Sequence, residues 1–237
     1  MTQDEFAAGL GALLQEMGQA VDGESLIKLY RHHKMVYAAN DTLRLTAIEE
    51  KNSPLLNFAD SLSPLAFLEK AQTICDIGSG AGFPGLALAI VKPGTSFMLL
   101  DSLKKRVGFL KDVIRELRLE NVQVEHMRAE DAGRDPRYRE RFDAVVARAL
   151  ASAPVLCEYA LPLLKIGGRM IAYKGSAAKE ELQAAQKALD VLGGAGAAVV
   201  PAMVPGRGHM LMTAEKVRPT PNAYPRRAGM PLKLPIA

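Results

Sequence analysis

Residues 76–85 have the sequence DIGSGAGFPG; they follow an apolar run at 73–77 and lead into a helical pattern at 83–91. This context predicts a tight turn that connects a strand to a helix. Glycine has no Cβ, so such a loop lets a ligand approach the backbone closely. Gly80, Gly82 and Gly85 match the spacing of a dinucleotide-binding loop, but that spacing alone is a weak signal.

Asp76, the first residue of this segment, narrows the choice of ligand. A carboxylate at the end of a strand can hold the loop and face a cationic ligand, whereas it would repel the pyrophosphate of a dinucleotide. S-adenosylmethionine has a sulfonium and an ammonium group and no phosphate. We therefore predict an S-adenosylmethionine site at Gly78 and Gly80, and a glycine-rich turn without a ligand is the alternative.

Short apolar runs and helical patterns alternate along the chain from residue 73, which predicts a parallel, doubly wound sheet. The last two runs, 197–204 and 210–217, are joined by only about five residues, whereas a parallel crossover needs roughly a dozen, so they must form an antiparallel hairpin. We expect an α/β fold with a seven-stranded, Rossmann-like sheet of the methyltransferase type, in which five parallel strands precede the hairpin. The five expected strands are 73–77, 96–100, 122–127, 142–147 and 169–173.

The chain is expected to consist of an N-terminal helical cap at 1–70, a methyltransferase domain at 71–217 and a basic, proline-rich tail at 218–237. Apolar residues recur at helical spacing in the cap, and no Gly/Ser linker separates it from the domain. A helix is predicted at 61–69, with Asp60 as its N-cap; a catalytic carboxylate is the alternative role of Asp60.

Three local patterns in the chain predict structural rather than chemical roles. His32 and His33 lie in a basic cluster without partners at metal-ligand spacing, which favours a solvated surface. The glycine-rich segment 193–198 predicts a turn. The methionines that alternate within the last two strands are expected in the core: Met203, Met210 and Met212.

The composition limits the class of protein. The chain has 237 residues, of which 49% are hydrophobic and 24% charged, so it can bury a core without a metal or a disulfide. Two cysteines make no disulfide framework, and no apolar run approaches the roughly 18 residues of a membrane span. The first residues also lack a basic signal region. We expect a cytoplasmic monomer with no metal and no membrane partner.

Two acidic positions follow expected strands and are candidates for binding a nucleoside. Asp101 ends the second strand, where an acid commonly binds ribose hydroxyls; its alternative role is to cap the helix at 103–117. Ala129 and Glu130 follow the third strand. A carboxylate there can accept a hydrogen bond from the adenine amino group while the backbone of Ala129 borders the ring, and solvated loop acids are the alternative.

These residues together resemble a known family. The chain is similar to the glucose-inhibited division protein B family, the small-subunit ribosomal RNA methyltransferase G family, over about residues 40–237. The combination is more specific than any single motif. The matching motifs are LTAI at 45–48, DSL at 60–62, the glycine loop, LLDS at 99–102 with Lys105-Arg106, Arg128-Ala129-Glu130, Phe142-Asp143 with Arg148-Ala149, Lys174-Gly175, and the tail from Thr220 to Pro231.

The resemblance implies that the protein uses S-adenosylmethionine to methylate N7 of guanine 527 in 16S rRNA, within the small ribosomal subunit. The family often has a histidine three residues before the aspartate of the DSL motif, where this chain has Asn57, so that histidine cannot be an obligate acid or base here. The cofactor contacts that the resemblance assigns are Gly78, Phe83, Ala129, Glu130 and Arg148.

The chemistry of guanine N7 predicts a site without a general base. Its lone pair lies in the plane of the ring, so attack on a sulfonium methyl group requires no deprotonation. We therefore expect no catalytic residue that moves a proton, and a rate set by positioning and by exclusion of water. Arg148 and Lys174 are candidates for holding an RNA phosphate or the guanine edge rather than for transferring a proton.

The tail adds two candidate RNA contacts, Arg226 and Arg227, beside Tyr224 as a stacking surface. The alternative is that the tail packs back on its own domain. Aromatic residues make up only 5% of the chain, so shape and phosphate recognition must contribute more than stacking. A methyltransferase for a small molecule or a protein is the alternative function, and it would have little use for the basic tail.

Overall fold

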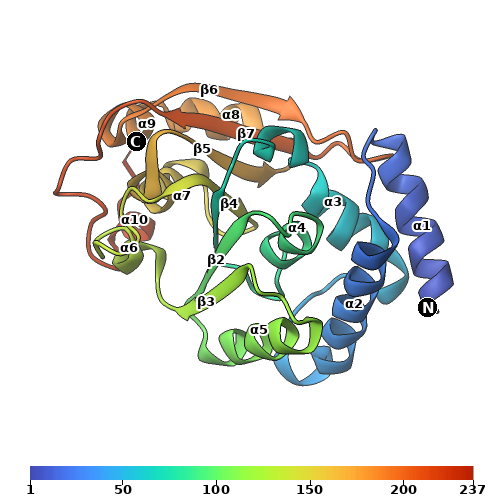
Figure 1. Ribbon diagram of the computed structural model, residues 1–237. Coiled ribbons are helices and arrows are strands. Elements are labelled where there is room, and N and C mark those ends of the chain that lie inside the picture. The colour runs from blue at the N-terminus through green and yellow to red at the C-terminus, as the bar shows by residue number, and fades with distance from the viewer. Residues whose placement is uncertain (237) are drawn as a thin grey trace.

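The computed structural model describes residues 1–236 and contains a seven-stranded sheet. Its strands are β1 (Thr73–Ile77), β2 (Ser96–Asp101), β3 (Val122–His126), β4 (Phe142–Arg148), β5 (Leu164–Lys174), β6 (Gly194–Pro201) and β7 (Met210–Lys216). The order across the sheet is β3-β2-β1-β4-β5-β7-β6 (Figure 1). β1 to β5 are parallel, and β7 is antiparallel to both of its neighbours. The predicted sheet of five parallel strands and a C-terminal hairpin is therefore confirmed.

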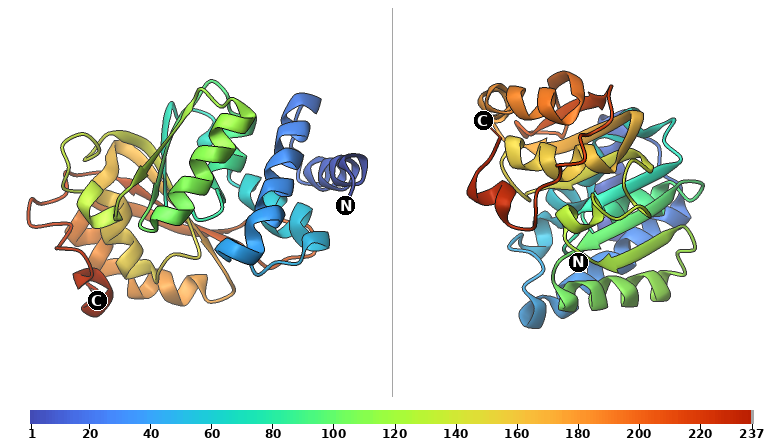
Figure 2. Two further views of the ribbon diagram at one scale, coloured as in Figure 1. Left: turned by 90° about the horizontal axis from the view of Figure 1, so that it is seen from below. Right: turned by 90° about the vertical axis from the view of Figure 1, so that its left-hand side faces the viewer.

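Helices cover both faces of this sheet. They are α1 (Gln3–Glu16), α2 (Gly23–Leu43), η1 (Glu50–Asn52), η2 (Pro54–Ala59), α3 (Asp60–Leu62), η3 (Leu65–Leu68), α4 (Gly85–Val91), α5 (Lys104–Leu117), α6 (Ala129–Ala132), α7 (Ala153–Ala160), η4 (Leu161–Leu163), α8 (Ala178–Ala184), α9 (Gln186–Leu192) and α10 (Met230–Lys233). Successive residues of a strand point to opposite faces, so Ile74 packs in one core and Cys75 in the other. The cap, α4 and α5 pack in the first core, and α7, α8 and α9 pack in the second (Figure 2).

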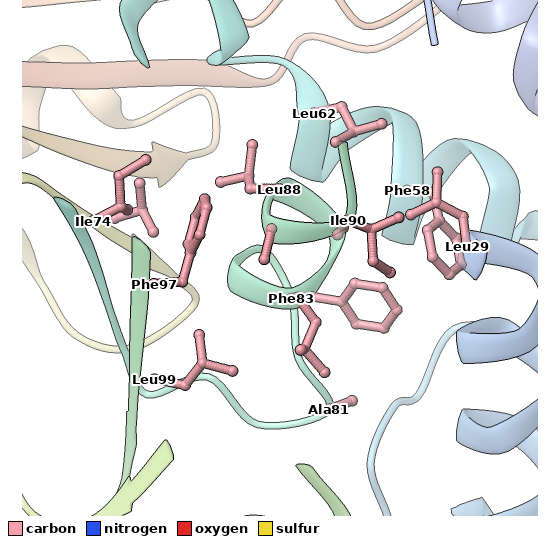
Figure 3. Close-up of a cluster of buried hydrophobic side chains, with 14 of the residues drawn as sticks. Leu29, Phe58, Leu62, Ile74, Ala81, Phe83, Leu88, Ile90, Phe97 and Leu99 are labelled. Atoms are coloured by element: carbon pink, nitrogen blue, oxygen red, sulfur yellow. The ribbon is translucent and has the colours of Figure 1, made fainter. Parts of the chain in front are cut away.

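The cap shares a hydrophobic core with the sheet domain. Leu29 of α2 and Phe58 of η2 lie in the same buried cluster as Ile90 of α4 and Phe97 of β2 (Figure 3). Phe58 also makes an edge-to-face contact with Phe83 of the glycine-rich loop, at a centroid distance of 5.0 Å. The cap therefore packs directly against the loop that was predicted to bind the cofactor.

The prediction of a helix at 61–69 is wrong, because the helix lies earlier in the chain. The helical path begins at Pro54, passes through a π-helical turn and ends at Leu62, and a separate 3₁₀ turn follows at η3. Proline is well suited to the first turn of a helix, which explains the early start. Asp60 therefore lies inside the helical path and makes no N-cap hydrogen bond, so its predicted capping role is wrong as well.

The solvated surface predicted for His32 and His33 is also wrong, because both side chains are fully buried. α2 is a 21-residue helix whose buried residues include Ser25, Leu29, His32 and Val36, and these are spaced three or four positions apart. The two histidines belong to this inward face. Their neighbours Arg31 and Lys34 are exposed, and this alternation of basic residues concealed the helical face in the sequence.

Two predictions near the hairpin are wrong in part. β6 begins at Gly194, so only Gly193 belongs to the expected turn at 193–198. Gly193 has φ +87°, and a Cβ there would lie 2.3 Å from the carbonyl oxygen of Arg218. Met212 is buried as expected, but Met203 is 72% exposed because β6 ends at Pro201 and the loop turns outward. Met210 is half-buried.

The C-terminal tail packs along α6 and α7 on the side of the second core. Arg139 donates hydrogen bonds to the carbonyl oxygens of Thr220 at 2.7 Å and Tyr224 at 2.8 Å. Arg134 donates to the carbonyl oxygen of Pro225 at 2.7 Å, and Pro225 is buried. The described part of the tail, up to residue 236, is therefore held against its own domain.

Candidate functional site

A cavity of about 970 Å³ opens at the carboxyl ends of β1, β4 and β5. Ligands bind at these strand ends in open α/β sheets, and the volume lies within the usual range of small-molecule sites. The cavity wall includes the 45–48 loop after α2 and three residues of the cap helices (Leu56, Asn57 and Asp60). It also includes residues of the glycine loop between Gly78 and Phe83, the segment 147–152 at the end of β4, and Arg207 and His209 before β7.

The glycine loop presents its backbone to this cavity at Gly80. Gly80 has φ +57°, and the nearest atom to an added Cβ would be the carbonyl oxygen of Gly78 at 3.9 Å. Gly85 differs, since a Cβ there would lie 2.4 Å from Leu99 and 2.5 Å from the carboxylate of Asp76. Gly85 is thus required for packing of the loop on the sheet, whereas Gly80 leaves open space in which a ligand can approach the backbone.

Asp76 holds the loop but does not face the cavity. The prediction that its carboxylate faces a cationic ligand is therefore wrong. Its side chain is completely buried, and its Oδ2 accepts a hydrogen bond from the backbone N–H of Gly85 at 2.9 Å. Oδ1 is buried without a hydrogen-bond partner among residues 1–236. This burial raises the pKa of Asp76 to about 7, because desolvation disfavours the carboxylate form.

Asp101 holds the same loop from the second strand. Its Oδ2 accepts from the N–H of Gly80 at 2.9 Å, and its Oδ1 accepts from the N–H of Leu103 at 2.8 Å. The side chain is 3% exposed and does not line the cavity. Asp101 therefore joins the open part of the glycine loop to the start of α5.

Three polar side chains meet in the cavity wall. Asp60 of α3 accepts a hydrogen bond from Nη1 of Arg148 at 3.1 Å, and its other oxygen lies 2.8 Å from Nδ1 of His209. The Arg148 guanidinium also lies 5.2 Å from the ring centroid of Phe83, a cation–π distance. This cluster connects the cap, the end of β4, the glycine loop and the β6–β7 hairpin around one space.

Lys174, at the end of β5, lines the cavity but is engaged by neighbouring groups. Its ammonium group donates to the carbonyl oxygen of Ala151 at 2.9 Å and to the carboxylate of Glu181 at 2.6 Å. Only 7% of the side chain is exposed. Lys174 and its ion-pair partner Glu181 therefore both belong to the cavity wall.

The structure places Glu130 and the tail arginines outside the cavity wall. Glu130 is 4% exposed, and its Oε1 accepts from the N–H of Gly229 at 2.8 Å. Arg226 is paired with Glu158 of α7, whereas Arg227 is exposed. The side chain of Glu130 therefore connects α6 to the tail.

Of the residues selected from sequence, the cavity brings together Gly78, Gly80, Phe83, Arg148 and Lys174. Asp101, Ala129, Glu130, Arg226 and Arg227 lie outside its wall. The sequence favoured a capping role for Asp60 and did not place Arg207 or His209 at the cavity, although all three line it. The DSL motif, which contains Asp60, was a signal in the sequence. The local pattern of the β6–β7 hairpin does not indicate that the hairpin borders the cavity.

Residues 1–236 contain no group of three or more His, Cys, Asp or Glu side chains that could hold a metal ion. Within the same residues, every helix is too short or too polar to cross a bilayer.

A protein-family model described as GidB, rRNA small subunit methyltransferase G, matches residues 25–209. The chain belongs to this family. It is 43% identical over 229 residues to ribosomal RNA small subunit methyltransferase G of Geobacillus sp. (strain WCH70), covering 94% of this chain and 96% of the relative. It is 41% identical over 243 residues to the protein of the same name from Leuconostoc mesenteroides, covering 100% of both chains.

Solved structures show the same fold at much lower identity. An O-methyltransferase from Bacillus cereus in complex with SAH superposes with a TM-score of 0.55 and 19% identity, covering 78% of this chain and 91% of that chain. A predicted O-methyltransferase from Agrobacterium tumefaciens superposes with a TM-score of 0.54 and 21% identity, covering 68% and 82%. These similarities show that the chain has the same fold as these O-methyltransferases.

Proposed function

We propose that this protein transfers the methyl group of S-adenosylmethionine to N7 of guanine 527 in 16S rRNA of the small ribosomal subunit, as a monomer in the cytoplasm. One observation carries the proposal beyond family membership: the open backbone of Gly80 and the basic side chains of Arg106, Arg148 and Arg207 border one cavity. That arrangement suits a small cofactor on one side and a polyanionic substrate on the other.

The residues of the chain fit the cofactor. Gly80 leaves a cradle that a side chain would fill, and the cavity has ample volume for a nucleoside and an amino-acid moiety. Arg148 can pair with the carboxylate of the methionine moiety, and the Phe83 ring beneath its guanidinium provides an apolar surface. The remaining proposed contacts are Gly78, Asp101 through the ribose, and Ala129 with Glu130 at the adenine, although Asp101, Ala129 and Glu130 lie outside the wall of this cavity.

The proposed reaction requires alignment rather than proton transfer. When bound, S-adenosylmethionine supplies an electrophilic methyl group whose bond to sulfur breaks as the bond to N7 forms, leaving a neutral thioether. The N7 lone pair needs no base. The chain therefore has to orient the guanine so that N7 is in line with the methyl carbon and the sulfur, and it has to exclude water. Asp60 and Arg148 restrain each other by their ion pair at the place where this orientation is needed.

RNA recognition is proposed to depend on phosphate contacts outside the cofactor loop. Arg207 lies in the cavity wall on the β6–β7 loop, and Arg227 is exposed on the tail. Lys174 and Arg226 are the other proposed contacts, although both form close ion pairs within the chain. Phosphate contacts of this kind position the RNA, and the shape of the cavity then selects the base.

The proposal is tested by mapping N7-methylguanosine in 16S rRNA. Small subunits and protein-free 16S rRNA from cells that lack this protein are incubated with the purified protein and S-adenosylmethionine. Reductive cleavage at N7-methylguanosine, read by primer extension, should then show a stop at position 527 that is absent without the protein. Methyl incorporation into another nucleotide, into protein or into a small molecule, with no stop at 527, would contradict the proposal.

A further inference from the structure

His32 of α2 contacts the glycine-rich loop directly. Its Nε2 lies 2.7 Å from the carbonyl oxygen of Ala81, and its side chain is completely buried. A carbonyl oxygen can only accept a hydrogen bond, so the proton must be on Nε2 of the ring. The cap thereby donates a hydrogen bond to the residue that follows Gly80.

The same imidazole ring also supports Phe83. The two rings are stacked with a centroid distance of 4.8 Å and an interplanar angle of 28°, and Phe58 packs edge-on against both. Figure 3 shows the ring of Phe83 extending from the loop toward Phe58 of the cap. Phe83 also contacts Arg148, whose guanidinium lies over the Phe83 ring. His32 therefore contacts two residues that line the cavity, Ala81 and Phe83.

The charge state of His32 suits a donor beside a cationic ligand. Burial lowers its pKa to about 4, so the ring is neutral at physiological pH. Nδ1 is buried and has no hydrogen-bond partner within residues 1–236. The ring thus contributes one donor and an aromatic surface, and it adds no positive charge near the sulfonium site.

We propose that His32 is a positioning residue for the cofactor loop, an inference that rests on the proposed function. The loop is rich in glycine and loses much conformational entropy when it is fixed. Asp101 fixes the N–H of Gly80, Asp76 fixes the N–H of Gly85, and His32 fixes the carbonyl of Ala81 between them. The cap consequently takes part in cofactor binding as well as forming the wall of the cavity.

Two substitutions separate the hydrogen bond from the aromatic contact. His32→Phe keeps a ring in the core and removes the N–H donor, whereas His32→Gln keeps an amide N–H of similar reach and removes the ring. His33→Phe is the matched control, since His33 is the next residue of the same helix, is equally buried and contacts Ser53 and Glu50 rather than the loop. Each protein is measured by calorimetric titration with S-adenosylmethionine, by thermal melting, and by hydrogen exchange of the 76–86 segment without ligand.

We expect His32→Phe to raise the Kd for S-adenosylmethionine about tenfold, the scale of one lost hydrogen bond. Hydrogen exchange of 76–86 should become faster in His32→Phe. In His32→Gln, both the Kd and the exchange rate should lie between those of the wild type and those of His32→Phe. His33→Phe should keep the wild-type Kd even where its melting temperature falls as far as that of His32→Phe.

A wild-type Kd in His32→Phe would overturn the inference while leaving the proposed function intact. An equal rise in Kd in His33→Phe and His32→Phe would do the same, because the effect would then follow core stability rather than the loop contact. Failure of the wild-type protein to bind S-adenosylmethionine would instead refute the proposed function, and the inference with it.

Discussion

Arg226 of the tail forms a bidentate ion pair with Glu158 of α7. Its Nε donates to both carboxylate oxygens, at 2.9 and 3.1 Å, its Nη2 donates to Oε2 at 2.6 Å, and its backbone N–H donates to Oε1 at 2.7 Å. The Glu158 side chain is 1% exposed, whereas that of Arg226 is 25% exposed. A buried carboxylate needs a partner, so this pair fixes the tail to the domain.

Arg226→Met should therefore destabilise the fold. The substitution keeps the apolar stem and leaves the Glu158 carboxylate buried without its guanidinium, which should cost roughly 3 kcal/mol of unfolding free energy. Denaturant unfolding measures this loss. Arg227→Met, an exposed neighbour, is the control and should leave stability unchanged. Equal stability of the two variants would mean that the Arg226–Glu158 pair does not hold the tail.

Arg227 is an exposed arginine of the tail, and we expect it to contact an RNA phosphate. If it neutralises one phosphate, Arg227→Ala should flatten the slope of log affinity against log salt by about 0.7 on single-stranded RNA. Affinity for S-adenosylmethionine and the melting temperature should stay at their wild-type values. RNA binding measured between low and physiological salt checks the slope, and an unchanged slope would remove Arg227 from the RNA interface.

Gly80→Asp should abolish cofactor binding in a protein that still folds. Aspartate tolerates the left-handed conformation of Gly80 better than most residues, and the nearest protein atom to the new Cβ is 3.9 Å away. The carboxylate would instead occupy the space of the ligand. Calorimetry tests the loss of cofactor binding, and circular dichroism tests whether the variant still folds. Gly85→Ala is the contrasting variant and should unfold, because its Cβ would lie 2.4 Å from Leu99.

Asp76 should make stability depend on pH. The pKa of Asp76 is about 7 in the folded protein, against an ordinary value of 3.8, so between these values the folded state holds a proton that the unfolded state has released. Stability contributed by Asp76 is consequently present below about pH 4 and is lost as pH rises to about 7.

Asp76→Asn keeps an oxygen for the N–H of Gly85 and cannot ionise. The unfolding free energy of the wild type, measured relative to this variant, should fall as pH is raised from about 4 to about 7 and then level off. Parallel pH profiles for the two proteins would show that Asp76 titrates normally despite its burial.

His209 should not act as a general base, although it borders the cavity next to Asp60. Under single-turnover conditions with saturating cofactor and RNA, the wild type and His209→Gln should have the same pH profile from about pH 6 to 9, because attack by N7 moves no proton. A rate increase in the wild type with an apparent pKa near 6.5 that disappears in His209→Gln would assign a proton transfer to this histidine.

Much of the sheet could be predicted because its signals are local. β1 occupies 73–77 as expected, since an apolar run ends there at a glycine-rich turn. The hairpin followed from the short connection before Met210, which excludes a parallel crossover. The left-handed positions of the glycine loop could be predicted in the same way, because glycine is the residue that adopts them readily.

The contacts between distant segments could not be predicted from such patterns. Asp60 contacts Arg148 and His209 in the cavity wall, and these residues come from three separate parts of the chain. The burial of His32 depends on the face that α2 presents to the loop, which charged neighbours concealed. The hydrogen bond between Glu130 and Gly229 likewise arises when the tail returns to α6.

The position of β7 determines the order in which the fold can be completed during synthesis. β6 precedes β7 in the chain, yet β7 lies between β6 and the rest of the sheet and is the strand with which β6 pairs. A nascent chain that ends before residue 210 therefore has no place for β6, and the exposed edge of β5 is available for mispairing with other chains. Closure of that edge, followed by docking of the tail on α7, has to wait for roughly the last tenth of the polypeptide to leave the ribosome.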